Sequence, residues 1–248
     1  MPELSTDVLL IVFLAIAVGA FVKGLTGFGM PLITTPVIAP YLGLGHALAL
    51  MVVPAIASNL WIMWVQRGQG PAAKTVAPVM LASLPTIGLG VWVLTLVPNR
   101  YLFAFMGFWL LAYLAWHFWR EGRGLSIKSQ TLLGPAVGLM AGFTQGTTGM
   151  TTPFVVTYLH AMKLTPRAYA YANVVIYQVF WVVHGAFLYA FGLFDAERLW
   201  QGVLAVIPMA IFLPLGIHFN GRVDAKLFDR IIVALMVLLS ARLFWVAA

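Results

Sequence analysis

Long apolar runs separated by short polar stretches organise this chain of 248 residues. A helix needs about 20 consecutive apolar residues to cross a bilayer. Runs of that length lie at about 47–65, 76–97, 101–119, 168–191, 199–219 and 231–246. Two further runs, 8–41 and 132–160, are longer than one crossing and contain glycine-rich stretches in the middle. We expect each of these two to be a broken helix, either two short crossings or a re-entrant helical pair.

The glycine-rich stretches interrupt both long runs in a similar way. The first is Gly19-Ala-Phe-Val-Lys-Gly-Leu-Thr-Gly-Phe-Gly-Met-Pro31, and the second is Gly138-Leu-Met-Ala-Gly-Phe-Thr-Gln-Gly-Thr-Thr-Gly-Met-Thr-Thr-Pro153. Their glycines and prolines release backbone N–H and C=O groups from helical hydrogen bonds. In a membrane such groups are tolerated only where they are buried in protein or line a water-filled cavity. A pair of interrupted segments at corresponding places in two halves is typical of the central site of a transporter.

The chain therefore divides into two related halves. We expect an N-terminal membrane repeat at 1–120, a polar cytoplasmic linker at 121–130 and a C-terminal membrane repeat at 131–248. After its first glycine, each stretch has three more, which are Gly24, Gly27 and Gly29 in the first and Gly142, Gly146 and Gly149 in the second. With these glycines aligned, the uncharged Ala141 stands opposite Lys23.

Loop charges predict how the two halves are oriented. Lysine and arginine gather in loops at 67–74, 120–128, 163–167 and 222–230. Short loops rich in these residues mark the cytoplasmic side, and all four share that side only if each broken segment enters and leaves on one face. The second half then begins on the opposite face. We predict an all-α polytopic membrane protein of two inverted repeats, each a broken or re-entrant helical segment followed by three transmembrane helices, with both termini outside.

The composition supports a membrane protein without a soluble domain. Hydrophobic residues make up 62% and charged residues 8% of the chain, against about 45–50% apolar and about 25% charged residues in soluble domains. The acidic start differs from the positive start of a signal peptide, so we expect the first segment to stay in the mature protein. The absence of cysteine excludes thiol chemistry and thiolate metal sites. A cytoplasmic bias of lysine and arginine accounts for most of the net charge of +7, and we expect no nucleic-acid partner.

Acidic residues are confined to loops and to the ends of predicted helices. They are Glu3, Asp7, Glu121, Asp195, Glu197, Asp224 and Asp229. Because intramembrane acids are the usual partners of cations and the usual proton relays, a neutral or anionic ligand is favoured. Lys23 is the only lysine well inside an apolar run. A charge at the bilayer centre costs about 2.5–3.5 kcal/mol, so Lys23 either faces an anion in a cavity or extends its ammonium to the nearer surface.

Backbone N–H groups at the breaks are the main candidates for holding an anion, because half-helix N-termini combine free donors with a positive dipole end. Hydroxyl and amide side chains nearby add donors. The predicted substrate-binding residues are Lys23, Gly24, Thr26, Gly27, Gly29, Gln145, Gly146, Thr147, Thr148, Gly149 and Asn173. Close helix packing is the alternative role of the glycines. His184 has two possible roles: it carries a coupling proton, or it is a histidine packed in the core. Asn59 is expected to join helices. We expect no metal site and no cofactor.

The two stretches resemble those of the TauE/SafE family, the sulfite exporter-like membrane permeases. The resemblance rests on Gly19, Lys23-Gly24 and Gly27-Phe-Gly29, on Gly138, Gly142 and Gly146-Thr-Thr-Gly149, and on small residues after each stretch. It covers essentially the whole chain. It implies transport of sulfite, of sulfonates such as sulfoacetate or taurine-related compounds, or of other small organic anions. Family members often have consecutive glycines where Met30-Pro31 and Met150-Thr151 stand here.

These observations predict a secondary transporter, and not an enzyme, that moves a small anion across the cell inner membrane by alternating access. A gradient of protons or of the anion drives it, since the chain has no ATP-binding motif. Two alternatives stay open: a membrane-embedded enzyme or accessory subunit, and a passive anion channel. The expected partners are the anion, the lipid bilayer and a coupling ion, taken to be a proton. A homodimer is compatible with the pattern.

Overall fold

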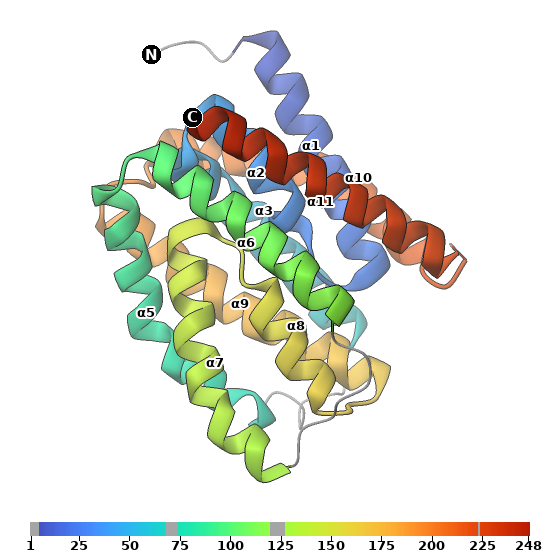
Figure 1. Ribbon diagram of the computed structural model, residues 1–248. Helices are drawn as coiled ribbons and strands as arrows, with labels where there is room; N and C mark the ends of the chain where they lie inside the picture. Colours follow the sequence, from blue (N-terminus) through green and yellow to red (C-terminus); the bar gives the residue numbers. More distant parts are fainter. Residues whose placement is uncertain (1–4, 68–73, 120–126, 223) are drawn as a thin grey trace.

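The computed structural model describes residues 5–67, 74–119, 127–222 and 224–248 (Figure 1). The first half contains α1 (Thr6–Thr26), α2 (Met30–Leu42), α3 (Leu44–Val65), α5 (Ala77–Leu96) and α6 (Asn99–Trp119). The second half contains α7 (Ile127–Thr148), α8 (Thr152–Ala161), α9 (Pro166–Ala190), α10 (Ala196–Phe219) and α11 (Ala225–Ala247). The described residues form no strand, and the all-α prediction is confirmed.

Helix lengths agree with a multi-pass membrane protein. Within the described residues, six helices are long and apolar enough to cross a membrane, namely α1, α3, α5, α9, α10 and the part of α11 from Arg230 onward. α7 begins at Ile127, so residues 127–130 at the end of the polar stretch are already helical. Lysine and glutamine are good helix formers, and an apolar pattern cannot mark a helix start that lies in polar sequence. The linker residues 121–126 lie outside the described residues.

Each broken segment folds back on itself. α2 lies antiparallel along α1, because the Thr34 hydroxyl donates to the Ala15 carbonyl at 3.1 Å and Gly19 packs against Met30 and Thr34. α8 returns along α7, where the Tyr158 side chain lies against Gly134. In Figure 1, α7 rises from the bottom of the view and α8 leads back down. The two helices of each broken segment therefore lie antiparallel and side by side.

The two halves interleave in space. α1 packs on α10, and α7 packs on α5, so the broken helix of each half lies against a helix of the other half. α3 and α9 pack against each other, α10 also contacts α3, and α5 also contacts α9. α6 and α11 pack together on the face toward the viewer in Figure 1. The two sequence repeats are therefore not separate bundles.

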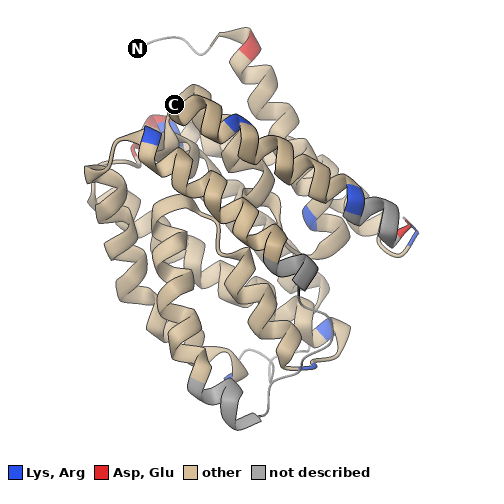
Figure 2. Cartoon of the chain, viewed as in Figure 1, with Lys and Arg blue, Asp and Glu red and all other residues tan. Residues whose placement is uncertain are grey.

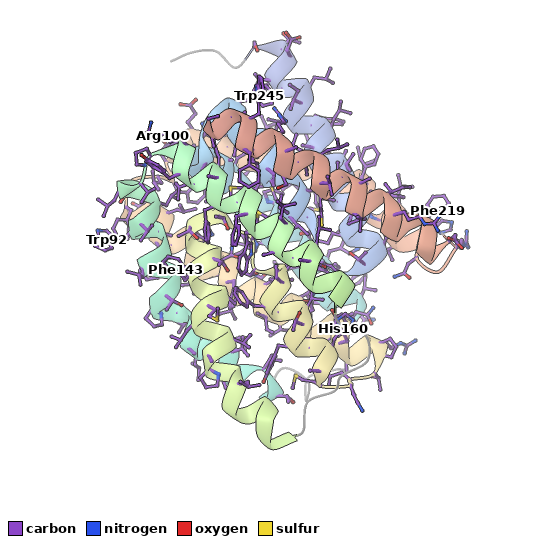
Figure 3. The ribbon with its side chains drawn as sticks, in the orientation of Figure 1. Trp92, Arg100, Phe143, His160, Phe219 and Trp245 are labelled. Carbon is purple, nitrogen blue, oxygen red and sulfur yellow. The ribbon has the colours of Figure 1, made fainter. Side chains whose placement is uncertain are left out.

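The described acids lie at helix ends, as the sequence predicts, and several tryptophans are exposed. The acids with described side chains are Asp7, Asp195, Glu197 and Asp224, and all four lie at helix ends (Figure 2). Glu3 and Glu121 fall outside the described residues. Among the described side chains, five tryptophans are exposed, from 39% for Trp61 to 84% for Trp245, and the other three are Trp64, Trp92 and Trp200. Figure 3 shows Trp92 and Trp245 at the periphery, as expected of interfacial anchors.

Candidate functional site

Glycines in the left-handed region end both broken helices. Gly27 (φ +82°) follows α1 and donates its N–H to the Lys23 carbonyl at 2.7 Å. Gly149 (φ +71°) follows α7 and donates to the Gln145 carbonyl at 2.9 Å. Gly29 (φ +94°) then precedes α2. Because side chains other than glycine's rarely adopt such φ values, these residues fix the two breaks.

The breaks meet at one cavity. It is small and partly open to the exterior. Both halves contribute to its lining, which consists of Lys23, Phe28, Gly29, Pro31, Asn59, Gln145, Gly149, Thr151, Thr152, Tyr177 and Trp181. Helices α2 and α8 both begin at this cavity. The first N–H groups of a helix have no partner within the helix, so both helix starts can offer donors and a positive dipole end here.

Lys23 is buried at this cavity and is held by uncharged groups. Its side chain is 3% exposed. Its Nζ donates to the Ser58 hydroxyl at 2.8 Å and to Oδ1 of Asn59, both on α3. No acid of the described part forms an ion pair with it, and α1, α2, α3, α7 and α9 contain no acid near the cavity. The alternative in which Lys23 extends to the surface is wrong.

Gln145 occupies the same place in the second half. Lys23 and Gln145 each stand four residues before the glycine that ends their helix. Each also bonds to the third helix of its own half, since Nε2 of Gln145 lies 3.1 Å from Nδ1 of His184 on α9. The sequence alignment that put Ala141 opposite Lys23 is therefore wrong. The two halves are matched correctly when the left-handed glycines that end α1 and α7, Gly27 and Gly149, are aligned with each other.

Several buried polar atoms around the cavity lack a partner among the described residues. They are Nδ2 of Asn59, Oε1 of Gln145, Oδ1 of Asn173 and Nε2 of His184. Nδ2 of Asn173 donates to the Gly27 carbonyl at 3.1 Å, which ties α9 to the break of the first half. His184 is fully buried, packs on the Trp181 ring and does not line the cavity. Unpartnered buried polar groups are costly, so they indicate a site that a polar ligand or water completes.

Gly24 and Gly146 are packing residues. A Cβ on Gly24 would lie 2.4 Å from the Leu213 carbonyl oxygen and 2.8 Å from Cα of Gly216, on α10. A Cβ on Gly146 would lie 2.2 Å from the Ile87 carbonyl oxygen on α5. Both face a neighbouring helix, and neither lines the cavity. The structure thus supports the close-packing alternative for these two predicted site residues.

The predicted threonine donors are engaged by the backbone. Thr26 lies within hydrogen-bond distance of the Val22 and Phe28 carbonyls and accepts from the Phe28 N–H. Thr147 donates to the Phe143 carbonyl at 3.0 Å, and Thr148 donates to the Thr144 carbonyl at 2.9 Å. These hydroxyls are therefore used in local hydrogen bonds to the helix backbone. They are not among the cavity-lining residues.

Comparison with family models settles the identity of the chain. Residues 11–243 match the model described as Sulfite exporter TauE/SafE. The chain belongs to the TauE/SafE family. TauE/SafE proteins are membrane transporters, so the expectation of a transporter that is not an enzyme is confirmed. Comparisons with curated proteins and with solved structures found no match.

Some cavity residues of this TauE/SafE protein were missed from the sequence. Phe28 and Thr152 belong to the breaks, and Tyr177 and Trp181 come from α9. The missed signal is spacing: Asn173, Tyr177 and Trp181 follow one another at intervals of four residues, which places them on one helix face. Trp181 is 2% exposed, unlike the interfacial tryptophans.

Proposed function

We propose that this protein is a secondary carrier for a small anion, such as sulfite, a small sulfonate or a related organic anion. The observation that carries the proposal is the buried Lys23, which lines a cavity between two helix breaks and has no acidic partner in the described part. An ammonium held by uncharged partners in a buried site is costly unless an anion joins it. The cavity therefore suits an anion.

The proposed binding groups differ in part from the predicted list. Nζ of Lys23 supplies the charge, and Nδ2 of Asn59 supplies a further donor. Backbone N–H groups come from the first turns of α2 and α8, since Gly24, Gly146 and the neighbouring hydroxyls serve packing and helix ends. The bound anion would rest between Lys23 and Gln145, where both halves meet.

Alternating access is the proposed mechanism, built on an inverted repeat. Exchanging α1, α2, α3, α5 and α6 for α7, α8, α9, α10 and α11 turns the α1–α10 contact into the α7–α5 contact. The same exchange turns the Gly24–Gly216 contact into the Gly146–Gly90 contact. Figure 1 supports opposite directions for the two broken segments, because α1 starts at the top of the view and α7 at the bottom. Rocking of one repeat against the other would expose the cavity to each side in turn.

The proposed location is the cell inner membrane, with a proton as the coupling ion. Arg67, Lys163, Arg167 and Arg222 lie in or beside loops between helices. By the lysine and arginine bias of cytoplasmic loops, these loops would face the cytoplasm and both termini would lie outside. We also propose that the protein forms a homodimer, which a measurement of its mass in detergent would test.

Flux through purified protein in liposomes tests the proposal. We expect saturable uptake of labelled sulfite, a small sulfonate or a small carboxylate, with counterflow when unlabelled anion is trapped inside. Gly149→Leu should abolish flux, because a Cβ there would lie 2.6 Å from the Leu48 side chain and the backbone has φ +71°. Gly192→Leu is the matched control, since Gly192 has φ +72° and no neighbour within 4 Å of its Cβ position.

Three outcomes would contradict the proposal. Folded protein that moves none of these anions would exclude the proposed substrates. Full flux in Gly149→Leu would place the path elsewhere. Anion conductance without saturation or counterflow would replace the carrier with the passive channel.

A further inference from the structure

The hydrogen bonds of Lys23 leave one position of its amine toward the cavity. Nζ donates to Ser58 Oγ and to Asn59 Oδ1. Ser58 lies 2.9 Å from the Ala55 carbonyl, to which its hydroxyl donates, so Ser58 acts as an acceptor toward Lys23. Two N–H groups of Lys23 are thereby used. The remaining position holds a lone pair in a neutral amine and a third N–H in an ammonium.

Both protonation states satisfy the observed bonds, so the occupant of the cavity decides between them. With an anion in the cavity, the third N–H forms a charge-assisted hydrogen bond. Without an anion, the ammonium has only uncharged partners in a site that is 3% exposed, and burial of a charge without a counter-ion favours its loss.

Few other titratable groups of the described part lie on the helices around Lys23, and none of those near it is a carboxylic acid. On α9, Tyr177 lines the cavity and His184 lies behind Gln145 and Trp181. On α10, which packs on this part of α1, the next titratable residue is His218, which is exposed and bonded to Arg222. Among the other described side chains, Tyr41 is at the end of α2, His46 is at the start of α3 and α7 offers none. None of these groups is an acid.

We infer that Lys23 is the proton-coupling site of the carrier, and that it binds one proton together with each anion. This inference rests on the proposed function. A monoanion and a proton from the same side form an ammonium–anion pair in the cavity. After reorientation the anion leaves and the amine releases its proton to the other side. One proton moves with each anion, no net charge crosses with a monoanion, and His184 is not the carrier of the proton.

Proteoliposomes measure this ratio directly. Labelled sulfite flux and the internal pH, reported by a trapped dye, are recorded together, with the membrane potential set by potassium and valinomycin. Wild type, Lys23→Arg and Lys23→Gln are compared at one pH, so that the buffering by sulfite itself cancels in the differences. Lys74→Gln is the control, because Lys74 is exposed and outside the cavity.

Lys23→Arg keeps a permanent charge. We expect it to move one proton fewer per anion than wild type and to become sensitive to the membrane potential. Lys23→Gln should raise KM about tenfold or more through loss of the charged hydrogen bond, and Lys74→Gln should match wild type. Elution as a single monodisperse peak and unchanged thermal stability show that each variant is folded.

Three results would overturn the inference while the carrier stands. The first is wild-type sulfite flux with the same proton count as Lys23→Arg. The second is flux driven by a sodium gradient. The third is loss of the proton count in His184→Gln with Lys23 intact. Absence of flux of any tested anion in wild type would overturn the proposed function and this inference together.

Discussion

Replacing Gly146 by alanine tests the packing role assigned to this residue. The added Cβ would lie 2.2 Å from the Ile87 carbonyl oxygen and 2.8 Å from Cα of Gly90. Since both atoms belong to the backbone of α5, no side chain can turn aside, and α7 and α5 must separate by about 1 Å to restore ordinary contact. Such overpacking costs about 1–3 kcal/mol.

Thermal unfolding in detergent measures this cost. In chains of 150–250 residues, 1 kcal/mol corresponds to about 2–4 °C in Tm, so Gly146→Ala should lower Tm by about 2–12 °C. Gly24→Ala should do the same, because its Cβ meets Leu213 and Gly216 on α10. Gly45→Ala is the control: its Cβ would lie 3.4 Å from the Leu193 side chain at ordinary contact, and Tm should not fall. An unchanged Tm in Gly146→Ala, with full transport, would refute the packing role.

Three further predictions concern groups outside the ion-binding chemistry. Thr26→Ser should keep the wild-type KM. Thr26→Val should lower Tm without changing KM, because the Thr26 hydroxyl bonds only to the backbone at the end of α1. A changed KM in Thr26→Val would show instead that Thr26 contributes to anion binding. Ser240→Ala should cost about 0.6–1.7 kcal/mol, since its hydroxyl donates to the Gly107 carbonyl at 2.8 Å between α11 and α6, and unchanged thermal stability would contradict this. The hydrogen bond from the Arg198 N–H holds the pKa of the Asp195 carboxyl below its usual value. This bond therefore stabilises the folded protein at pH values above the pKa that Asp195 has in the unfolded chain, and the stabilisation is lost as pH falls through the pKa of Asp195 in the folded protein. Asp195→Ala should accordingly lower Tm at pH 7 and have less effect in acid, and equal effects at both pH values would contradict the assignment.

The sequence was sufficient for features that depend on local chemistry. Glycine is the residue that most readily adopts the left-handed conformation that ends a helix, and the breaks after Thr26 and Thr148 lie inside the predicted glycine-rich stretches. The cost of burying acids likewise placed Asp7 and Asp195 at helix ends. Lys23 was singled out because no other lysine lies so deep in an apolar run.

The role of each glycine could not be read from the sequence. Gly24 and Gly27 are three residues apart, yet the first contacts α10 and the second ends α1 in the left-handed region. Which of these roles applies depends on the face that meets a neighbouring helix, and that is a tertiary property. The same limit hid Gln145 as the counterpart of Lys23, since counting glycines does not identify the one that ends the helix.

Locating a bound anion tests the central claim most directly. Selenite has the shape and charge of sulfite, and its selenium scatters anomalously, so a crystal grown with selenite shows where the anion lies. We predict an anomalous peak in the cavity between Nζ of Lys23 and Gln145, beside the first turns of α2 and α8, and its loss in Lys23→Gln. A peak at another place in protein that transports selenite, or one that persists unchanged in Lys23→Gln, would contradict the account.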